Sequence, residues 1–142
     1  MAFGSEAAQE GNAQAERRVI GLTFDTGALI ALERNRQRIV EVRQAALRRG
    51  LRVTVPAPVI TEWWRGRTNL REDIVASFRV EPLTDGIARL AGEALARVKG
   101  AIAIDAIVMA SAALRGDLVY TSATGDLEKL RVHFPSVRVL GI

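Results

Sequence analysis

Short apolar runs alternate with longer segments of helical periodicity along most of the chain. The apolar runs have the length and composition of strands buried in a parallel sheet. Expected strands cover residues 19–24, 51–55, 79–82, 118–121 and 137–140. Six helices are expected. One runs from Asp25 to about Arg49, a short one begins at Thr61, three cover residues 71–78, 84–99 and 105–114, and the last begins at Asp126. This alternation predicts one α/β domain over residues 18–142, with a mainly parallel sheet of four or five strands covered on both faces.

The first 17 residues differ from the rest. They are small, polar and rich in Gln, Glu and Ala, without periodicity, and predict a disordered N-terminal extension or a cloning remnant. They contain no apolar core of a signal peptide, and no apolar run in the chain reaches membrane-spanning length. A soluble, cytoplasmic protein without a membrane partner is therefore expected.

Composition removes several classes of chemistry. The chain has no cysteine and a single histidine, His133, which excludes thiol catalysis, disulfide scaffolds and cysteine or histidine zinc sites. It also lacks the serine-hydrolase elbow and the glycine-rich nucleotide-binding motifs. Any catalysis must therefore depend on carboxylates.

Of the 20 basic residues, 18 are arginine. Residues 17–142 contain 20 basic and 13 acidic residues, so this part of the chain has a net charge of +7. Arginine binds phosphate in a bidentate manner, and a basic domain of this kind favours a polyanionic partner.

Three acids follow or precede predicted elements at comparable places: Asp25 after the first strand, Glu62 in a first helical turn, and Asp105 at the start of an apolar helix. A parallel sheet would bring such positions to one edge. The structural alternative is helix capping by the two aspartates and a favourable dipole interaction for Glu62. Asp105, however, lies within AIAIDAIVMASAA, where an unpaired carboxylate is costly.

Converging carboxylates repel one another, which raises their pKa values unless a cation neutralises them, and oxygen ligands suit Mg²⁺ or Mn²⁺. A carboxylate-bound divalent ion is a common means of hydrolysing a phosphodiester. The residues thus predict a metal site. Nearby arginines are candidates for binding a nucleic-acid backbone, namely Arg34, Arg36, Arg65 and Arg67.

Three segments, LTFDTGALIALE, VITEWWRG and IDAIVMASAALRGDLVYTSATGDLEKL, resemble the PIN-domain ribonucleases, most closely the VapC-type toxins of bacterial toxin–antitoxin pairs. The resemblance covers about residues 19–142. It implies a PIN-like three-layer α/β/α sandwich and an Mg²⁺- or Mn²⁺-dependent endoribonuclease toxin that leaves 3′-hydroxyl and 5′-phosphate ends. It also implies a cognate antitoxin and a homodimer. By position, Asp25, Glu62 and Asp105 match the metal-binding acids, and Thr121 matches a polar residue that ends the fourth strand.

The chain departs from this pattern at Ala123, where the family usually has a fourth acid two residues after the threonine. Asp126, three residues further on, is expected either to contribute to the metal site or to cap a helix. Three interpretations are open: a natural site tuned through Asp126, a ligand replaced to silence a toxic nuclease, or a degenerate protein that binds without cutting.

Other functions compete with this one. Asp-Thr-Gly at residues 25–27 is also the tripeptide of aspartic proteases, but that class needs a β-rich fold. Phosphotransfer through Asp25 would need a second acid where Gly27 stands. The stronger alternative is a non-catalytic basic α/β module that binds RNA or a partner protein. Trp63 and Trp64 cannot both face the core of one helix, so one is expected to be exposed.

Overall fold

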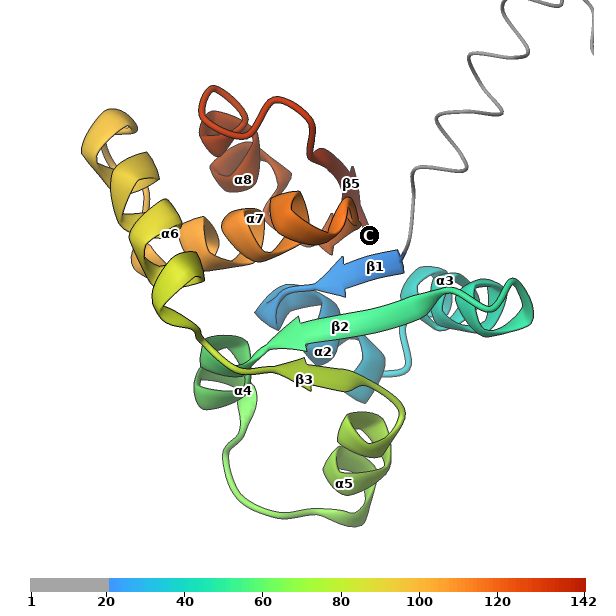
Figure 1. Ribbon diagram of the computed structural model, residues 1–142. Helices are drawn as coiled ribbons and strands as arrows, with labels where there is room; N and C mark the ends of the chain where they lie inside the picture. The colour runs from blue at the N-terminus through green and yellow to red at the C-terminus, as the bar shows by residue number, and fades with distance from the viewer. Residues whose placement is uncertain (1–20) are drawn as a thin grey trace, which may run out of the picture.

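The computed structural model describes residues 21–142, so the predicted extension at 1–17 and the first residues of the first strand lie outside the described part. Its five strands form one sheet in which every pairing is parallel. The order across the sheet is β3-β2-β1-β4-β5 (Figure 1). The strands are β1 (Gly21–Phe24), β2 (Arg52–Pro56), β3 (Arg79–Glu81), β4 (Leu118–Thr121) and β5 (Arg138–Gly141).

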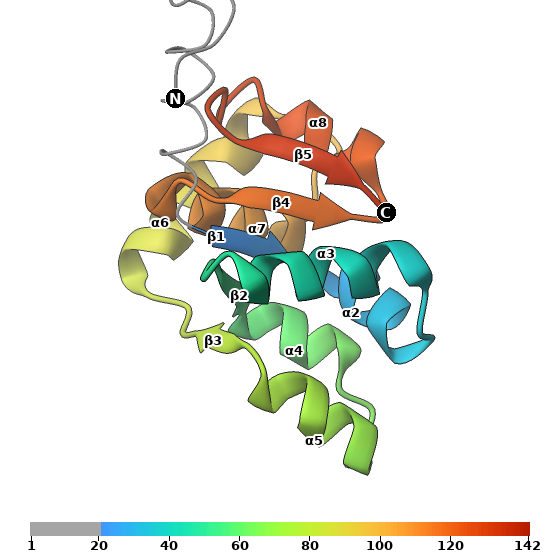
Figure 2. The same cartoon turned by 90° about the vertical axis from the view of Figure 1, so that its right-hand side faces the viewer.

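Seven helices accompany the sheet in the described part. They are α2 (Thr26–Glu33), α3 (Gln37–Arg48), α4 (Ala57–Trp63), α5 (Asn69–Ala76), α6 (Asp85–Arg97), α7 (Ala103–Arg115) and α8 (Thr124–Leu130). Helices α2 to α5 lie on one face and α6 to α8 on the other, as the two views in Figures 1 and 2 show. The predicted three-layer α/β/α architecture is confirmed. Among residues 21–142, no helix is both long enough and apolar enough to cross a membrane.

Strand β1 lies in the middle of the sheet, and all four of its residues are buried. It is flanked by β2 and β4, with Leu22 opposite both Val53 and Leu118. Both faces of β1 are covered, since the polar Thr23 is buried as well as the apolar Leu22 and Phe24. Because β1 is central, the residue that follows it, Asp25, opens onto the middle of the carboxyl edge of the sheet.

The prediction of a single long helix after Asp25 is wrong. The segment divides into α2 and α3, which are separated by Asn35 in the left-handed region at φ 54°. Asparagine tolerates this conformation better than most residues, and one such residue is enough to redirect the chain. The apolar periodicity continues across the break, so it did not reveal the turn.

The helix expected from Thr61 begins four residues earlier, at Ala57. Pro58 lies in its first turn, where a missing N–H costs nothing because first-turn N–H groups have no partner within the helix. Glu62 therefore lies in the last turn of α4, and its prediction as a first-turn acid is wrong. The last two helices also begin two residues before the expected positions, at Ala103 and Thr124.

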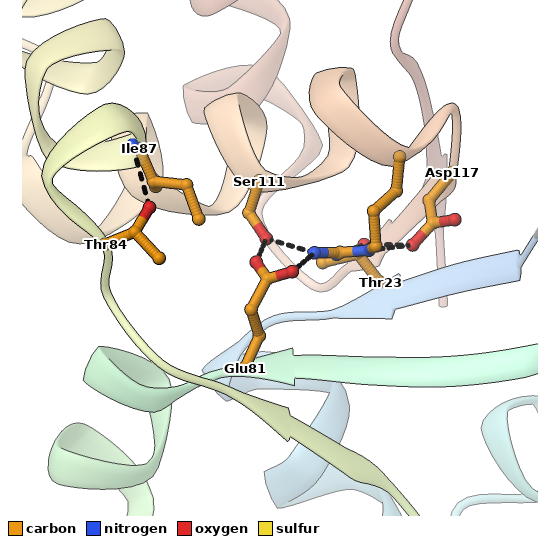
Figure 3. A network of polar contacts seen from close by, with 7 residues as sticks. Thr23, Glu81, Thr84, Ile87, Ser111 and Asp117 are labelled. Carbon is orange, nitrogen blue, oxygen red and sulfur yellow. Dashed lines mark hydrogen bonds and ion pairs between the residues drawn. The ribbon is translucent and has the colours of Figure 1, made fainter.

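A buried polar network fixes α7 against the sheet (Figure 3). Arg115 near the end of α7 forms ion pairs with Glu81 and with Asp117, the latter at 2.9 Å, and donates a hydrogen bond to Thr23 at 2.7 Å. Burial would raise the pKa of Glu81, but hydrogen bonds from Arg115 and Ser111 hold it below its usual value. Asp117, which is buried just before β4, is thus an internal ion-pair partner. The network orients the helix whose first turn carries Asp105.

Candidate functional site

Asp25 is the N-cap of α2, where its Oδ1 accepts a hydrogen bond from the N–H of Ala28 at 3.0 Å. The capping role considered from the sequence is therefore present. The side chain is also buried, and burial raises the pKa of its carboxyl group. Hydrogen bonds from Thr121 and from the N–H groups of Ala28 and Gly27 oppose that rise, while the charge of Glu62 adds to it. A carboxylate that only capped the helix would gain nothing from a neighbouring carboxylate, so capping does not explain the proximity of Glu62.

Glu62 is half-buried in the last turn of α4 and accepts a hydrogen bond from the hydroxyl of Thr26. The negative end of the helix dipole lies here, where a carboxylate is disfavoured. The favourable dipole interaction considered for Glu62 is thus absent. Thr26, which the sequence analysis noted only within the Asp-Thr-Gly tripeptide, links this acid to the helix that begins beside Asp25.

Asp105 lies in the first turn of α7, whose N-cap is Ile102, so its carboxylate does not cap the helix. Its pKa is raised to about 6, first by burial and then by the charges of Asp25, Asp126 and Glu62. These three charges act on Asp105 only because four acids from four elements approach one region. Convergence at the carboxyl edge of the sheet, predicted from the alternation of strands and helices, is the arrangement observed.

The turn between β4 and α8 completes this edge. Thr121 is buried at the end of β4, and its Oγ1 accepts a hydrogen bond from the N–H of Ala123 at 2.8 Å. Ala123 occupies the N-cap position of α8 and provides no side-chain cap. Asp126 is not the cap that the sequence suggested, since it lies in the first turn, exposed, with Lys129 at 4.0 Å.

The donor set has the chemistry of a site for a hard divalent cation. Its oxygen ligands share a negative charge that no ion pair within residues 21–142 offsets at Asp25, Glu62 or Asp105. The same described residues include no group of three His, Asp or Glu side chains already arranged to hold a metal ion. The acids therefore fit such an ion by type and charge, while the carboxylate of Glu62 is turned to Thr26.

Two hollows flank the exposed side of α2 and share Ile30 and Arg34. The first, the Glu62 hollow, has a volume of about 410 Å³ and is lined by Ile30, Glu33, Arg34, Glu62, Trp63, Arg65 and Arg71. The second, the Ser122 hollow, has a volume of about 430 Å³ and is lined by Gly27, Ile30, Ala31, Arg34, Arg36, Arg38, Ile39, Ser122 and Ile142. Arginines thus line both hollows, and Glu62 lines the first.

The predicted RNA-binding arginines do not form one group. Arg34 lines both hollows, Arg65 only the Glu62 hollow and Arg36 only the Ser122 hollow. Arg67 lines neither, and is exposed at 3.9 Å from Glu72. Arg38 also lines the Ser122 hollow.

Glu33 is the last residue of α2 and lines the Glu62 hollow. It accepts hydrogen bonds from the indole of Trp63 at 3.1 Å and from Arg71 at 2.9 Å, which connects α2, α4 and α5. Trp63 is buried and Trp64 is partly buried against the same core, so the expectation that one of the two is exposed is wrong. No short-range pattern marks Glu33, because its partners lie 30 and 38 residues away.

Comparison with known proteins adds a family and a set of similar folds. The family model for the PIN domain matches residues 22–130. No significant match is found among curated proteins.

Solved structures with a similar fold include three toxin–antitoxin complexes. A VapBC2 structure from Rickettsia felis, bound to a DNA fragment from its promoter, has a TM-score of 0.70 at 10% identity, covering 85% of this chain and 98% of that chain. DNA-bound VapBC from Salmonella typhimurium has a TM-score of 0.68 at 16% identity, and the match covers 87% of this chain and 98% of that chain. A toxin–antitoxin complex from Klebsiella pneumoniae has a TM-score of 0.63 at 19% identity, covering 84% and 96%. At these identities the similarity establishes the fold.

Proposed function

The chain belongs to the PIN-domain family, and from that premise we propose that it is a VapC-type endoribonuclease that uses Mg²⁺ or Mn²⁺ to hydrolyse RNA. The observation that carries the proposal is the coupling of acids at the sheet edge, where burial and then the charges of Asp25, Asp126 and Glu62 raise the pKa of Asp105. Such repulsion destabilises the protein unless a cation offsets it. Sites that perform chemistry commonly contain perturbed groups of this kind.

Asp25, Glu62 and Asp105 would hold the ion, with Asp126 at the margin. When bound, a divalent ion lowers the pKa of a water molecule and stabilises negative charge on a phosphate. The protein supplies orientation. Thr121 and two backbone N–H groups fix the carboxylate of Asp25, and Thr26 fixes that of Glu62.

Arginines beside the acids would bind the charged RNA backbone. Arg34 and Arg65 line the hollow that contains Glu62, and the charge of each guanidinium can neutralise a phosphate there. Arg71 is already paired with Glu33 at 2.9 Å, so it serves better as a structural support for the wall of this hollow. We also propose an antitoxin as partner, since one matched structure is described as a toxin–antitoxin complex, and a homodimer as the assembly, which rests on the resemblance to VapC-type toxins.

The first experiment compares Mn²⁺ binding by isothermal titration for the chain, for Ala123→Asp and for Ala123→Asn. Asn at the N-cap position of α8 can cap the helix as Asp does but adds no charge, so it separates stabilisation from metal binding. We expect only Ala123→Asp to gain affinity, by roughly tenfold or more, as loss of a supporting carboxylate changes affinity 10- to 100-fold. Asp25→Asn should bind least.

Cleavage of end-labelled RNA with the same proteins decides the catalytic status. Cutting by Ala123→Asp but not by the chain itself would identify residue 123 as a missing ligand position. Equal cutting by both would mean that Asp126 or water takes that role. If neither protein binds Mn²⁺ or cleaves RNA, the proposed nuclease activity is rejected. The alternative, a non-catalytic RNA- or protein-binding module, is favoured by Ala123 and by the lack of a preformed three-ligand group in the described residues.

A further inference from the structure

We propose that the Ser122 hollow binds the phosphodiester backbone of an unpaired RNA segment next to the acids. The inference rests on the proposed function and deepens it, because it assigns the path of the substrate on one side of the site. The hollow lies where α2, α3, the turn after β4 and the end of β5 meet, and it has a volume of about 430 Å³.

Charge distinguishes this hollow from its neighbour. The Ser122 hollow is lined by three arginines, Arg34, Arg36 and Arg38, and by no acid. The Glu62 hollow also has three arginines, but two glutamates line it as well. The formal charge of the Glu62 hollow is therefore +1, whereas that of the Ser122 hollow is +3. A polyanion is attracted more strongly to the Ser122 hollow.

The arginines of the Ser122 hollow are free to bind. No ion pair within residues 21–142 involves any of the three. Arg38 donates through Nε to the carbonyl of Gly141 at 2.9 Å, which orients its guanidinium and leaves the two terminal nitrogens available. The left-handed turn at Asn35 folds α3 back from α2 and so brings Arg34 and the two arginines after it to the same hollow.

The hollow adjoins Asp25 through Gly27. The N–H of Gly27 donates to the carboxylate of Asp25, and the same residue lines the hollow. A Cβ at Gly27 would lie only 1.9 Å from the Oγ of Ser122, so the absence of a side chain permits this close contact. A ligand with one charge per repeating unit could therefore occupy the hollow and reach the acids at the same time.

The floor of the hollow favours an unpaired strand. The partly exposed side chains of Ile30 and Ile142 provide apolar surface beside the arginines, whereas Ala31 and Ile39 are buried. Single strands can turn their bases toward such a surface while cations follow their phosphates, whereas the bases of a duplex are enclosed in the stack. An acidic peptide could use the same cations, but it would not need the adjoining carboxylates.

Fluorescence anisotropy with a short labelled single-stranded RNA tests the proposal in EDTA, where binding is measured without cleavage. Arg36→Ala/Arg38→Ala is compared with Arg48→Ala/Arg49→Ala, which removes equal charge from the exposed opposite end of α3. We expect the first pair to weaken binding roughly tenfold and to lower the salt slope by about 1.4, since each phosphate contact on a single strand contributes about 0.7. The control pair should change affinity less than about twofold.

Melting temperatures accompany these titrations because Arg38→Ala removes the bond to Gly141. If the double variant is unstable, Arg36→Ala alone provides the test, with an expected slope change of about 0.7. Equal losses from both pairs, preference for duplex RNA, or loss of binding to an acidic peptide but not to RNA would each overturn the proposal. If Ala123→Asp cleaves RNA but the arginine variants bind RNA as well as the original chain does, this inference fails and the proposed nuclease function stands. Absence of any RNA binding or metal-dependent cleavage would overturn the proposed function as well.

Discussion

Asp105→Asn is expected to stabilise the metal-free protein at neutral pH. The pKa of Asp105 rises from 3.8 to about 6 on folding, mainly through burial. Above pH 6 the native state must ionise a carboxyl group that ionises more easily in the unfolded chain, so the charge opposes folding. Two pKa units correspond to at most about 3 kcal/mol, and because the side chain is only half-buried we expect about 1–2 kcal/mol.

The sign of this effect has a defined pH window. Below about pH 4 the carboxyl is protonated in both states and the substitution should be neutral. The stability gain should appear between about pH 4 and 6 and be complete above pH 6. Urea unfolding of both proteins in EDTA across this range measures it, and the accompanying rise in melting temperature should be about 3–8 °C.

Asp73→Asn provides the matched control, since Asp73 is exposed on α5 and forms no ion pair within residues 21–142. Its effect should stay within about 0.5 kcal/mol. Excess Mn²⁺ should reverse the order of the main comparison, because it stabilises only the protein that binds it. An Asp105→Asn protein less stable than the original in EDTA at neutral pH, or a difference independent of pH, would refute the reasoning.

Three further substitutions test contacts around the site. Arg115→Met should lower the free energy of unfolding by about 3–5 kcal/mol, as two carboxylates lose their cation, which urea titration would measure. Gly27→Ala should cost about 1–3 kcal/mol because its Cβ meets the side chain of Ser122, and a double-mutant cycle with Ser122→Gly should recover part of the loss. Glu33→Ala should remove the hydrogen bond from the indole of Trp63, which tryptophan fluorescence would detect, and should lower the affinity for Mn²⁺, which titration would measure. Glu33→Gln, which keeps an acceptor oxygen, should retain part of both the hydrogen bond and the affinity.

Each of these has an outcome that contradicts it. An unchanged free energy of unfolding in Arg115→Met would mean that water reaches Glu81 and Asp117 and solvates their charges. Additive effects of Gly27→Ala and Ser122→Gly would show that the two side chains do not compete for the same space. Unchanged metal affinity in Glu33→Ala would confine the role of that residue to stability.

The sequence was sufficient for those features that depend on neighbouring residues. Continuous apolar runs such as that of β1 mark strands buried on both faces, and 3.6-residue periodicity marks the helices. The carboxylate chemistry was also predictable, since the lack of cysteine and the single histidine leave few other catalytic groups. Asp25 and Asp105 were selected in this way, and the topology brings them to the expected edge.

Local signals failed where one residue redirected the backbone. Asn35 divides an otherwise continuous helical pattern, and Pro58 is compatible with a first turn as well as with a loop. The error at Pro58 moved Glu62 to the wrong end of its helix. That error concealed the strongest argument for a functional role, because a carboxylate near a helix C-terminus is not explained by the dipole.

By itself, the sequence determined the alternation of strands and helices, the parallel sheet, the basic charge and the acids available for chemistry. Only the tertiary structure decided which charges meet: the coupling of Asp105 to three other acids, the partners of Glu33, and the separation of the arginines into two hollows. Periodicity is a property of neighbouring residues, whereas these contacts join positions more than 20 residues apart. They exist only after packing of the sheet and helices has fixed the distances on which electrostatic interaction depends.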